Sequence, residues 1–357
     1  MNCQAILVNY HGAELICDAV RSLGHSPGLR VDVVDNSVAD RETRFLCTHL
    51  PPGTGLLTPE RNLGFGQACN LAFTQGDSEF VLLLNPDARL LPGALEAMLT
   101  TLRENPRLGA VGPRVFWDES RRFLMPPSTF PSPGWYLRCR LGLSLPFLDT
   151  RADRRFRQSA LDAWRATRPL GVEALSGGHV LLRRSAVQKA GGLFDPAFFM
   201  YWEDSDLMLR LKRQGYQLAL EPRAEAIHLY THSPAKERML DDGWQVYERK
   251  HFGGPTWKWV ARLARAGRPG VAEPEQVCAI DEETDRLVLE APEGLAQWLL
   301  EISPAANFVP AIGCFGSGRQ VELPGALLRA FAGCKLYFRI AGDNIGQGPC
   351  RTWALPA

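Results

Sequence analysis

The sequence contains no apolar run of about 18 residues free of charged side chains, so we expect no membrane-spanning helix. No positively charged segment precedes the apolar run that begins at Gln4, so a secretory signal is not expected. The nine cysteines form no Cys-x-x-Cys pair, and their odd number favours reduced thiols over a disulfide framework. We therefore expect a cytoplasmic protein, with the inner face of the cell membrane as a peripheral location.

The chain also has no excess of charge of one sign. Its 40 basic and 39 acidic residues leave a formal net charge of +1, which gives no support for a nucleic-acid partner. A hydrophobic fraction of 45% is normal for a globular protein and is sufficient for a sizeable core. The length of 357 residues suggests about two domains.

Short apolar segments alternate with helical patterns in the first 110 residues. Residues 4–10, 31–37 and 80–84 are typical of buried strands, and amphipathic helical spacing follows each of them. This alternation predicts an α/β fold with a mostly parallel sheet. The predicted strands end near Asn9, Asp35 and Asp87, and ligands bind at the carboxyl ends of such strands.

Residues 114–171 interrupt this alternation. The segment holds eleven arginines, no lysine and five acidic residues. One interpretation is a solvated, variable insertion. The other is a lid on the acceptor side that attracts phosphate groups, because guanidinium groups pair well with phosphate oxygens.

The composition changes again near the C-terminus. Residues 1–265 form the predicted main domain, and residues 266–274 are rich in Gly, Pro and Arg, as in a linker. Short apolar runs separated by Gly, Pro and Asn then predict a small β-rich domain over residues 275–357. We expect donor binding not to require this domain.

Three clusters of residues have the composition of a catalytic site. Residues 84–87 read Leu-Asn-Pro-Asp after a strand, residues 202–206 place three carboxylates at a helix start, and His228 follows a short strand. Each also has an ordinary structural explanation: a turn aspartate, acids favoured by the helix dipole, and a hydrogen-bonded strand-end histidine. Their joint order on an α/β frame favours a function.

These clusters, with other matching stretches, resemble the family 2 inverting glycosyltransferases of GT-A fold, and most closely the bacterial rhamnosyltransferase-like branch. The resemblance runs in order from about residue 4 to residue 253. Besides the strands and clusters above, the matching stretches are residues 62–70, 175–184, 191–195 and 247–253.

The resemblance implies a divalent metal, Mn²⁺ or Mg²⁺, that neutralises the diphosphate leaving group. The family's Asp-x-Asp motif reads Asn85-Pro86-Asp87 here, so an amide replaces the first carboxylate. Asp87 and His228 would bind the metal, and Asn85 would touch the ribose or a metal-bound water. Imidazole favours Mn²⁺ somewhat over Mg²⁺.

The resemblance also assigns the catalytic base. Asp204 would accept the proton of the acceptor hydroxyl, and Glu203 would orient the acceptor. Trp202 would stack on a sugar, whereas Asp206 would be structural. Because Asp204 lies at a helix start, we expect its pKa to stay low.

The resemblance also implies which residues bind the donor nucleotide and its sugar. Asp35 would accept a hydrogen bond from the pyrimidine N3–H. Asn9 and Tyr10 would line the base pocket, and the Asn62 loop would contribute to nucleotide binding. The remaining candidates would let the backbone approach the donor sugar closely: Ser176, Gly177 and Gly178.

The resemblance therefore implies transfer of a sugar from dTDP-rhamnose or a UDP-sugar to the hydroxyl of a glycan or lipid-linked glycan, in cell-surface polysaccharide synthesis. The alternative, suggested by Asn85, is a catalytically lapsed protein that binds nucleotide sugar or glycan. A dinucleotide-binding dehydrogenase is disfavoured because no Gly-x-Gly-x-x-Gly motif follows the first strand. The basic, aromatic residues 257–265 suggest either peripheral membrane contact or an ordinary packed helix.

Overall fold

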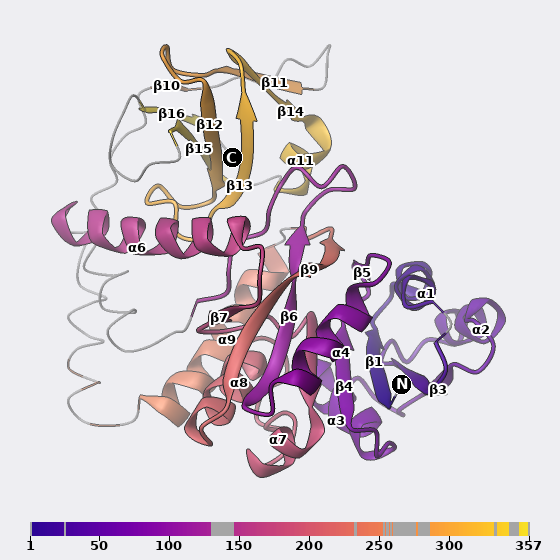
Figure 1. Cartoon of the computed structure of the whole chain (residues 1–357). Helices are drawn as coiled ribbons and strands as arrows, with labels where there is room; N and C mark the ends of the chain where they lie inside the picture. The colour runs from indigo at the N-terminus through magenta and orange to yellow at the C-terminus, as the bar shows by residue number, and fades with distance from the viewer. Residues whose placement is uncertain are drawn as a thin grey trace.

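The computed structural model describes residues 2–24, 26–129, 146–231, 234–252, 254, 257, 259, 276–277, 286–331, 334–342 and 350–355. Two parts follow each other along the chain, an α/β part and a β-rich C-terminal part, and helix α6 (Pro146–Arg165) lies between them (Figure 1). The predicted linker, residues 266–274, falls outside the described residues. Within the described residues, no helix is long and apolar enough to cross a membrane.

The α/β part is built on one sheet of nine strands, in the order β3-β2-β1-β4-β8-β6-β9-β5, with β7 paired to β9. The strands are β1 Cys3–Asn9, β2 Leu29–Asp35, β3 Gly55–Leu57, β4 Phe80–Leu84, β5 Ala88–Leu90, β6 Leu108–Phe116, β7 Leu170–Val172, β8 His179–Arg183 and β9 Gln217–His228. The pairings make β1, β2, β3, β4, β6 and β9 run in one direction, whereas β5, β7 and β8 run in the other. The predicted α/β class with a mostly parallel sheet is confirmed.

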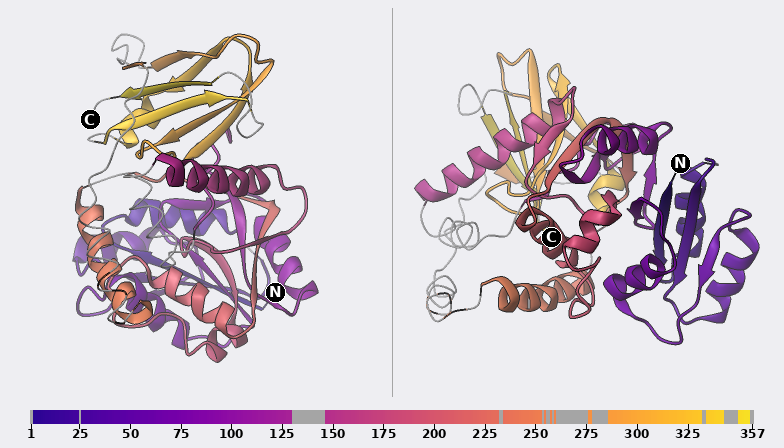
Figure 2. Two further views of the ribbon diagram at one scale, coloured as in Figure 1. Left: turned by 90° about the vertical axis from the view of Figure 1, so that its left-hand side faces the viewer. Right: turned by 60° about the horizontal axis from the view of Figure 1, so that its bottom comes forward.

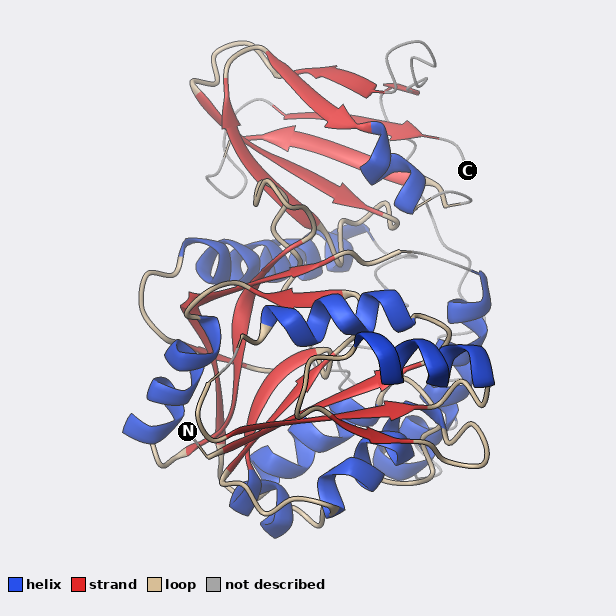
Figure 3. Cartoon of the chain, turned by 90° about the vertical axis from the view of Figure 1, so that its right-hand side faces the viewer, coloured by secondary structure: helices blue, strands red, loops and turns tan. Residues whose placement is uncertain are grey.

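Helices cover both faces of this sheet (Figure 3). The helices are α1 Ala13–Ser22, α2 Asp40–His49, α3 Gly64–Thr74, α4 Ala94–Glu104, α7 Arg184–Lys189, α8 Glu203–Arg213 and α9 Pro234–His251. Alternate residues of β1 point to opposite faces, as strand geometry requires. Ala5 and Leu7 pack with α1, α2 and α4, whereas Ile6 and Val8 pack with α3, α7 and α8.

One strand contains a proline in its interior. Strand β9 is continuous from Gln217 to His228, with Pro222 near its middle. Opposite β6, the register jumps from Pro113↔Glu221 to Arg114↔Glu225. The extra residues around Pro222 therefore form a bulge that the sheet absorbs, since proline cannot donate a ladder hydrogen bond.

The C-terminal part consists of a five-stranded sheet, β10-β16-β15-β12-β13, and a two-stranded sheet, β11-β14. Its elements are β10 Gln276–Val277, β11 Arg286–Glu290, β12 Gln297–Ser303, β13 Ile312–Ser317, β14 Gln320–Pro324, α11 Gly325–Ala330, β15 Leu336–Ala341 and β16 Cys350–Leu355. The predicted β-rich character is confirmed. The left view of Figure 2 shows this part above α6, and strands of both sheets contribute buried residues to one hydrophobic core.

Helix α6 of the arginine-rich segment packs against the C-terminal part. Phe156 and Trp164 of α6 share a core with Leu299 of β12. The Arg157 guanidinium is 6% exposed, and its Nε lies 3.0 Å from the Glu301 carboxylate. The helix is therefore an interface element and not a solvated insertion. An acceptor-side role for the segment stays a prediction, and Arg138 and Arg140 lie outside the described residues.

This packing changes the outcome that we expect for a chain ending near residue 265. Such a chain would expose Trp117, Phe123, Phe156 and Trp164, which are at most 7% exposed in the full chain. Burial of each ring contributes roughly 1.5–3 kcal/mol. We therefore expect the shortened chain to lose cooperative folding, as measured by thermal melting followed by circular dichroism. A sharp transition close to that of the full chain would contradict this expectation.

Candidate active site

The carboxyl ends of β1 and β2 are tied together by buried side chains. Asn9 is fully buried, and its Nδ2 lies 3.0 Å from both Asp35 Oδ1 and Ser37 Oγ. Asp35 Oδ2 accepts a hydrogen bond from Thr43 at 2.6 Å, and the Asp35 side chain is 2% exposed. Both residues lie at the strand ends, as predicted. Their contacts show that they also tie the ends of the two strands together, a frame that the sequence prediction did not include.

The Asn62 loop packs beside this frame. Asn62 Oδ1 accepts hydrogen bonds from Asn36 Nδ2 at 2.7 Å and from the Gly64 amide at 2.8 Å. Asn36 in turn accepts the Leu63 amide at 2.8 Å, so the two asparagines fix the entry to α3. Tyr10, directly after β1, is 59% exposed, and an exposed aromatic ring is a surface on which a flat ligand can stack.

The two predicted metal ligands lie side by side. His228 ends β9, and its Nε2 is 3.1 Å from Asp87 Oδ1. Ala88 pairs with His228 across β5 and β9, so the sheet itself brings the two chain segments together. Burial raises the pKa of Asp87, but the hydrogen bond and charge of His228 outweigh it and leave that pKa below its usual value. An ionised carboxylate beside an imidazole is a competent pair of metal ligands.

A second imidazole ring lies beside this pair. His179, at the start of β8, lies with its ring 5.4 Å from the His228 ring, in an edge-on arrangement. Burial, together with the charge on His228, lowers the pKa of His179 to about 3. The ring is therefore neutral at physiological pH, so it adds no positive charge that would repel a cation.

Asp87 and His228 alone supply too few metal-binding atoms, so a bound molecule would have to supply the others. Among the described residues, no group of three or more His, Cys, Asp or Glu side chains is placed to hold a metal ion. Asp87 and His228 supply one oxygen and one nitrogen, and Mn²⁺ or Mg²⁺ prefers further oxygen ligands. Diphosphate oxygens and water would complete the site. We therefore expect nucleotide and metal to bind together.

One loop joins the Asn85-Pro86-Asp87 segment to the predicted base. Asp204 Oδ2 accepts a hydrogen bond from the backbone N–H of Gly177 at 3.0 Å. On the other side, the backbone N–H of Asn85 donates to the Gly178 carbonyl at 2.8 Å. A Cβ on Gly177 would lie 3.0 Å from Asp204 Cβ, and one on Gly178 would lie 2.7 Å from Asn85 Nδ2. Because the two glycines have no side chain, this loop can lie close to Asp204 and Asn85. Their predicted approach to a donor sugar stays untested.

The neighbouring Ser176 closes this loop. Its Oγ accepts the amide of Gly178 at 3.2 Å, which fixes the turn between them. Because Gly177 and Gly178 are consecutive, with Cα atoms about 3.8 Å apart, the base and the Asn85-Pro86-Asp87 segment lie on two sides of the same short turn.

The expectation of a low pKa for Asp204 is wrong. Burial raises the pKa of Asp204, and the hydrogen bonds from Gly177 and Ser205 counter only part of this effect. The sequence argument considered the helix dipole alone. Loss of solvation outweighs the dipole because the dipole contributes only about 0.3–1 kcal/mol at exposed sites.

Glu203 lies deeper than the sequence prediction implied. It is 5% exposed, its Oε2 has no hydrogen-bond partner, and its Cγ lies against Gly66 of α3. Burial and the charge of Asp204 raise the pKa of Glu203 to about 8. The side chain is therefore mainly protonated at pH 7. Its role in orienting an acceptor stays a prediction.

Trp202, directly before α8, has a left-handed conformation with φ 70°, and Tyr201 before it has φ 67°. The Trp202 indole donates to the Leu240 carbonyl at 2.9 Å, and its ring lies 5.0 Å from that of Trp244. Helix α9 can approach this turn because Gly243 has no side chain: a Cβ there would lie 2.7 Å from the Tyr201 carbonyl. The sequence analysis missed Gly243, although a glycine within a helix often marks close packing.

Asp206 is structural, as expected. It is fully buried and accepts hydrogen bonds from Arg210 at 2.8 Å and His251 at 2.8 Å, with Lys250 also 2.8 Å away. These partners hold its pKa well below the usual range despite burial. The cluster anchors α9 to α8, and thereby fixes the base at the start of α8.

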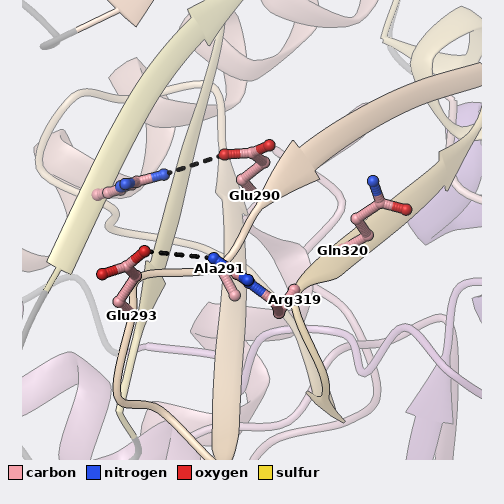
Figure 4. Close-up of a pocket in the computed structure, with 6 residues that line it drawn as sticks. Glu290, Ala291, Glu293, Arg319 and Gln320 are labelled. Carbon is pink, nitrogen blue, oxygen red and sulfur yellow. Dashed lines mark hydrogen bonds and ion pairs between the residues drawn. The ribbon is translucent and has the colours of Figure 1, made fainter.

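A separate pocket lies away from these residues. A hollow of about 660 Å³ lies on the C-terminal part (Figure 4), and its lining residues are Glu290, Ala291, Glu293, Arg319, Gln320 and Arg351. Ion pairs join Arg319 to Glu293 and Arg351 to Glu290. Its charges are thus largely paired with each other, and none of the predicted site residues lines it.

Asp87 and His228 next to strand ends, with the Asp204 carboxylate at a helix start on a mostly parallel sheet, form an arrangement typical of the nucleotide-sugar glycosyltransferase class. The chain belongs to glycosyl transferase family 2, because the model of that family matches residues 5–188.

Comparisons with individual proteins agree with this family. The chain is 33% identical over 198 residues to an N-acetylglucosaminyl-diphospho-decaprenol L-rhamnosyltransferase of Mycobacterium tuberculosis. That match covers 52% of this chain and 62% of the relative, so the chain spans less than two thirds of the relative's length. It is also 24% identical over 246 residues to a low-salt glycan biosynthesis hexosyltransferase of Haloferax volcanii, covering 68% and 71% of the two chains.

Among solved structures, the chain is similar to a mannosyltransferase of Pyrobaculum calidifontis in complex with GDP-Man and Mn²⁺. The TM-score is 0.44 and the sequence identity is 17%, over 75% of this chain and 65% of that one.

Proposed function

We propose that the protein is an inverting, metal-dependent glycosyltransferase that uses a pyrimidine nucleotide diphosphate sugar. The observation that carries this proposal is the turn at Ser176–Gly178, which bonds to Asp204 on one side and to Asn85 on the other. A proton acceptor and a metal-binding segment thereby share one site. That combination suits attack by a hydroxyl with departure of a diphosphate.

The roles of the protein groups follow from their chemistry. Asp204 would take the proton of the acceptor hydroxyl on the face opposite the leaving group. Asp87 and His228 would hold the metal, which neutralises charge on the departing diphosphate. The exposed rings of Tyr10 and Phe199, 59% and 51% exposed, offer surfaces for the base and for a sugar.

The donor and acceptor proposals rest on similarity. The rhamnosyltransferase relative supports dTDP-rhamnose as the first donor candidate, with a UDP-sugar second. Its name also supports an acceptor hydroxyl on a lipid-linked glycan. An acceptor of that kind would place the protein at the cytoplasmic face of a membrane. Trp259, 64% exposed, is a described residue suited to peripheral contact there.

The alternative is a lapsed protein that binds nucleotide sugar without transfer. The observation in its favour is Asn85, which replaces a carboxylate of the family motif. A thermal-shift panel of nucleotide sugars, with and without Mn²⁺, tests whether a donor binds, because ligands of the folded state raise the melting temperature. No Mn²⁺-dependent shift with any nucleotide sugar would contradict both proposals.

We expect Asp35 to select pyrimidines. Its Oδ2 accepts one hydrogen bond, from Thr43, and a second lone pair remains for the N3–H of uracil or thymine. Calorimetry should show tighter binding of UDP or dTDP than of ADP and GDP, by about tenfold or more for one buried hydrogen bond. Equal affinity for the purine diphosphates would contradict the assignment.

A further inference from the structure

The strand that carries His228 continues directly into contact with the C-terminal part. After β9 ends, the amide of Leu229 donates to the Asp87 carbonyl at 3.0 Å, and that of Tyr230 donates to the His228 carbonyl at 2.8 Å. The rings of His228 and Tyr230 are 6.4 Å apart and edge-on. A displacement of Tyr230 would therefore be transmitted to the Asp87–His228 pair within two residues.

Tyr230 also contacts the core of the C-terminal part, through both its backbone and its ring. Its carbonyl accepts the indole N–H of Trp117 at 2.8 Å. Its ring lies 6.2 Å from that of Phe331, which caps α11 and is 7% exposed. Tyr230 thus packs against the core of the C-terminal part. Figure 1 shows α11 above the carboxyl ends of β6 and β9.

Trp117 is itself fixed by that core. It follows β6, is 7% exposed, and its amide donates to the Phe123 carbonyl at 2.7 Å. The next residue, Leu124, exchanges two hydrogen bonds with Gly313 of β13, at 2.7 and 2.9 Å. The segment after β6 therefore pairs with β13, the edge strand of the five-stranded sheet. Both contacts that hold Tyr230 originate in one packed unit.

We propose that the C-terminal domain positions the metal-binding end of β9, and that Tyr230 is the positioning residue. This inference rests on the proposed function, in which Asp87 and His228 hold the metal. Segments beyond the end of a strand are poorly ordered unless other parts of the chain hold them. Ordering such a segment upon binding would cost conformational entropy. If the C-terminal part orders the segment beforehand, metal and nucleotide binding do not carry this cost.

The test uses the full-length chain with Phe331→Leu, which keeps an apolar side chain and removes the ring that Tyr230 contacts. In the metal-free protein, we expect faster amide hydrogen exchange at Leu229 and Tyr230. In the presence of dTDP or UDP, whichever binds more tightly, we expect the Mn²⁺ concentration at half-saturation to rise about tenfold, the effect typical of lost ligand positioning. Saturating Mn²⁺ should restore most of the nucleotide binding.

Two further variants separate positioning from general loss of stability. Phe338→Leu removes a fully buried ring from β15 in the same core. We expect it to lower the melting temperature comparably and to leave the Mn²⁺ half-saturation unchanged. Tyr230→Ala removes the other ring of the same contact and should reproduce the Phe331→Leu effect.

The outcomes are distinguishable. If Phe338→Leu shifts the Mn²⁺ half-saturation as much as Phe331→Leu, or if Phe331→Leu leaves both readouts unchanged, the positioning role is wrong. If His228→Ala itself leaves the Mn²⁺ dependence unchanged, the metal assignment of the proposed function is wrong. If His228→Ala weakens the Mn²⁺ dependence as expected and Phe331→Leu leaves it unchanged, the positioning role of Tyr230 is wrong and the proposed function stands.

Discussion

Asp204→Asn should lower turnover by about 10²–10⁴-fold, the range for loss of a general base. The substitution keeps the shape of the side chain and removes its ability to accept a proton. The new amide group would still place one oxygen near the Gly177 amide, which Asp204 now bonds at 3.0 Å. The Ser176–Gly178 turn should therefore keep its position, and nucleotide affinity should stay within a few-fold of the original value.

The pH dependence gives a second signature of this role. Burial raises the pKa of Asp204, and the base acts only when it is ionised. Turnover should therefore rise as the pH increases through this raised pKa, so the acidic limb of the profile lies above the usual range of an aspartate. In Asp204→Asn this limb should disappear from the residual rate, as measured in steady-state assays from about pH 4 to 8.

Glu203→Gln is the matched control for this variant. Because the pKa of Glu203 is raised to about 8, its carboxyl is mainly neutral at pH 7, and an amide imitates that state. We expect a smaller loss, chiefly in the KM of the acceptor. If Glu203→Gln is inactive while Asp204→Asn retains most of its turnover, the two roles must be exchanged.

Asp87→Ala should abolish metal-dependent nucleotide binding. The described residues offer no third acidic, His or Cys ligand, so removal of Asp87 leaves only His228. Loss of positioning alone costs about 10–100-fold in metal affinity, and loss of a ligand should exceed that. Calorimetry of UDP and dTDP with and without Mn²⁺ should show enhancement by the metal in the unsubstituted chain and none in Asp87→Ala.

The control for Asp87→Ala is Asp77→Ala, at an exposed position before the other end of β4. It removes the same charge from the protein and should leave the effect of Mn²⁺ intact. His228→Ala should weaken the metal effect but retain part of it, because the carboxylate remains. Unchanged Mn²⁺ dependence in Asp87→Ala would show that the metal assignment is wrong.

Local sequence patterns predicted the frame of the site well. The apolar strands ending at Asn9 and Asp35 were visible because strand ends, helix starts and hydrophobic periodicity are local properties. The pairing of Asp87 with His228 required the family resemblance, since their contact depends on β5 meeting β9.

Long-range packing was not visible in the sequence. The pKa of Asp204 depends on burial by segments distant in the chain, and this burial outweighed the local dipole. The interface role of α6 depends on Arg157 meeting Glu301, a residue 144 positions later. Gly243 carried a signal of its own, but its partner, the Tyr201 turn, became evident only with α9 in place.

The most direct measurement is the release of nucleoside diphosphate from dTDP-rhamnose and a panel of UDP-sugars, with and without Mn²⁺, in the unsubstituted chain and in Asp87→Ala. Water can take the place of the acceptor hydroxyl as the nucleophile, so this assay needs no knowledge of the acceptor. The account predicts Mn²⁺-dependent release from at least one pyrimidine donor, and none in Asp87→Ala. Tight Mn²⁺-dependent binding without release, even after addition of lipid-linked glycan, would contradict it and identify a protein that binds nucleotide sugar without transferring it.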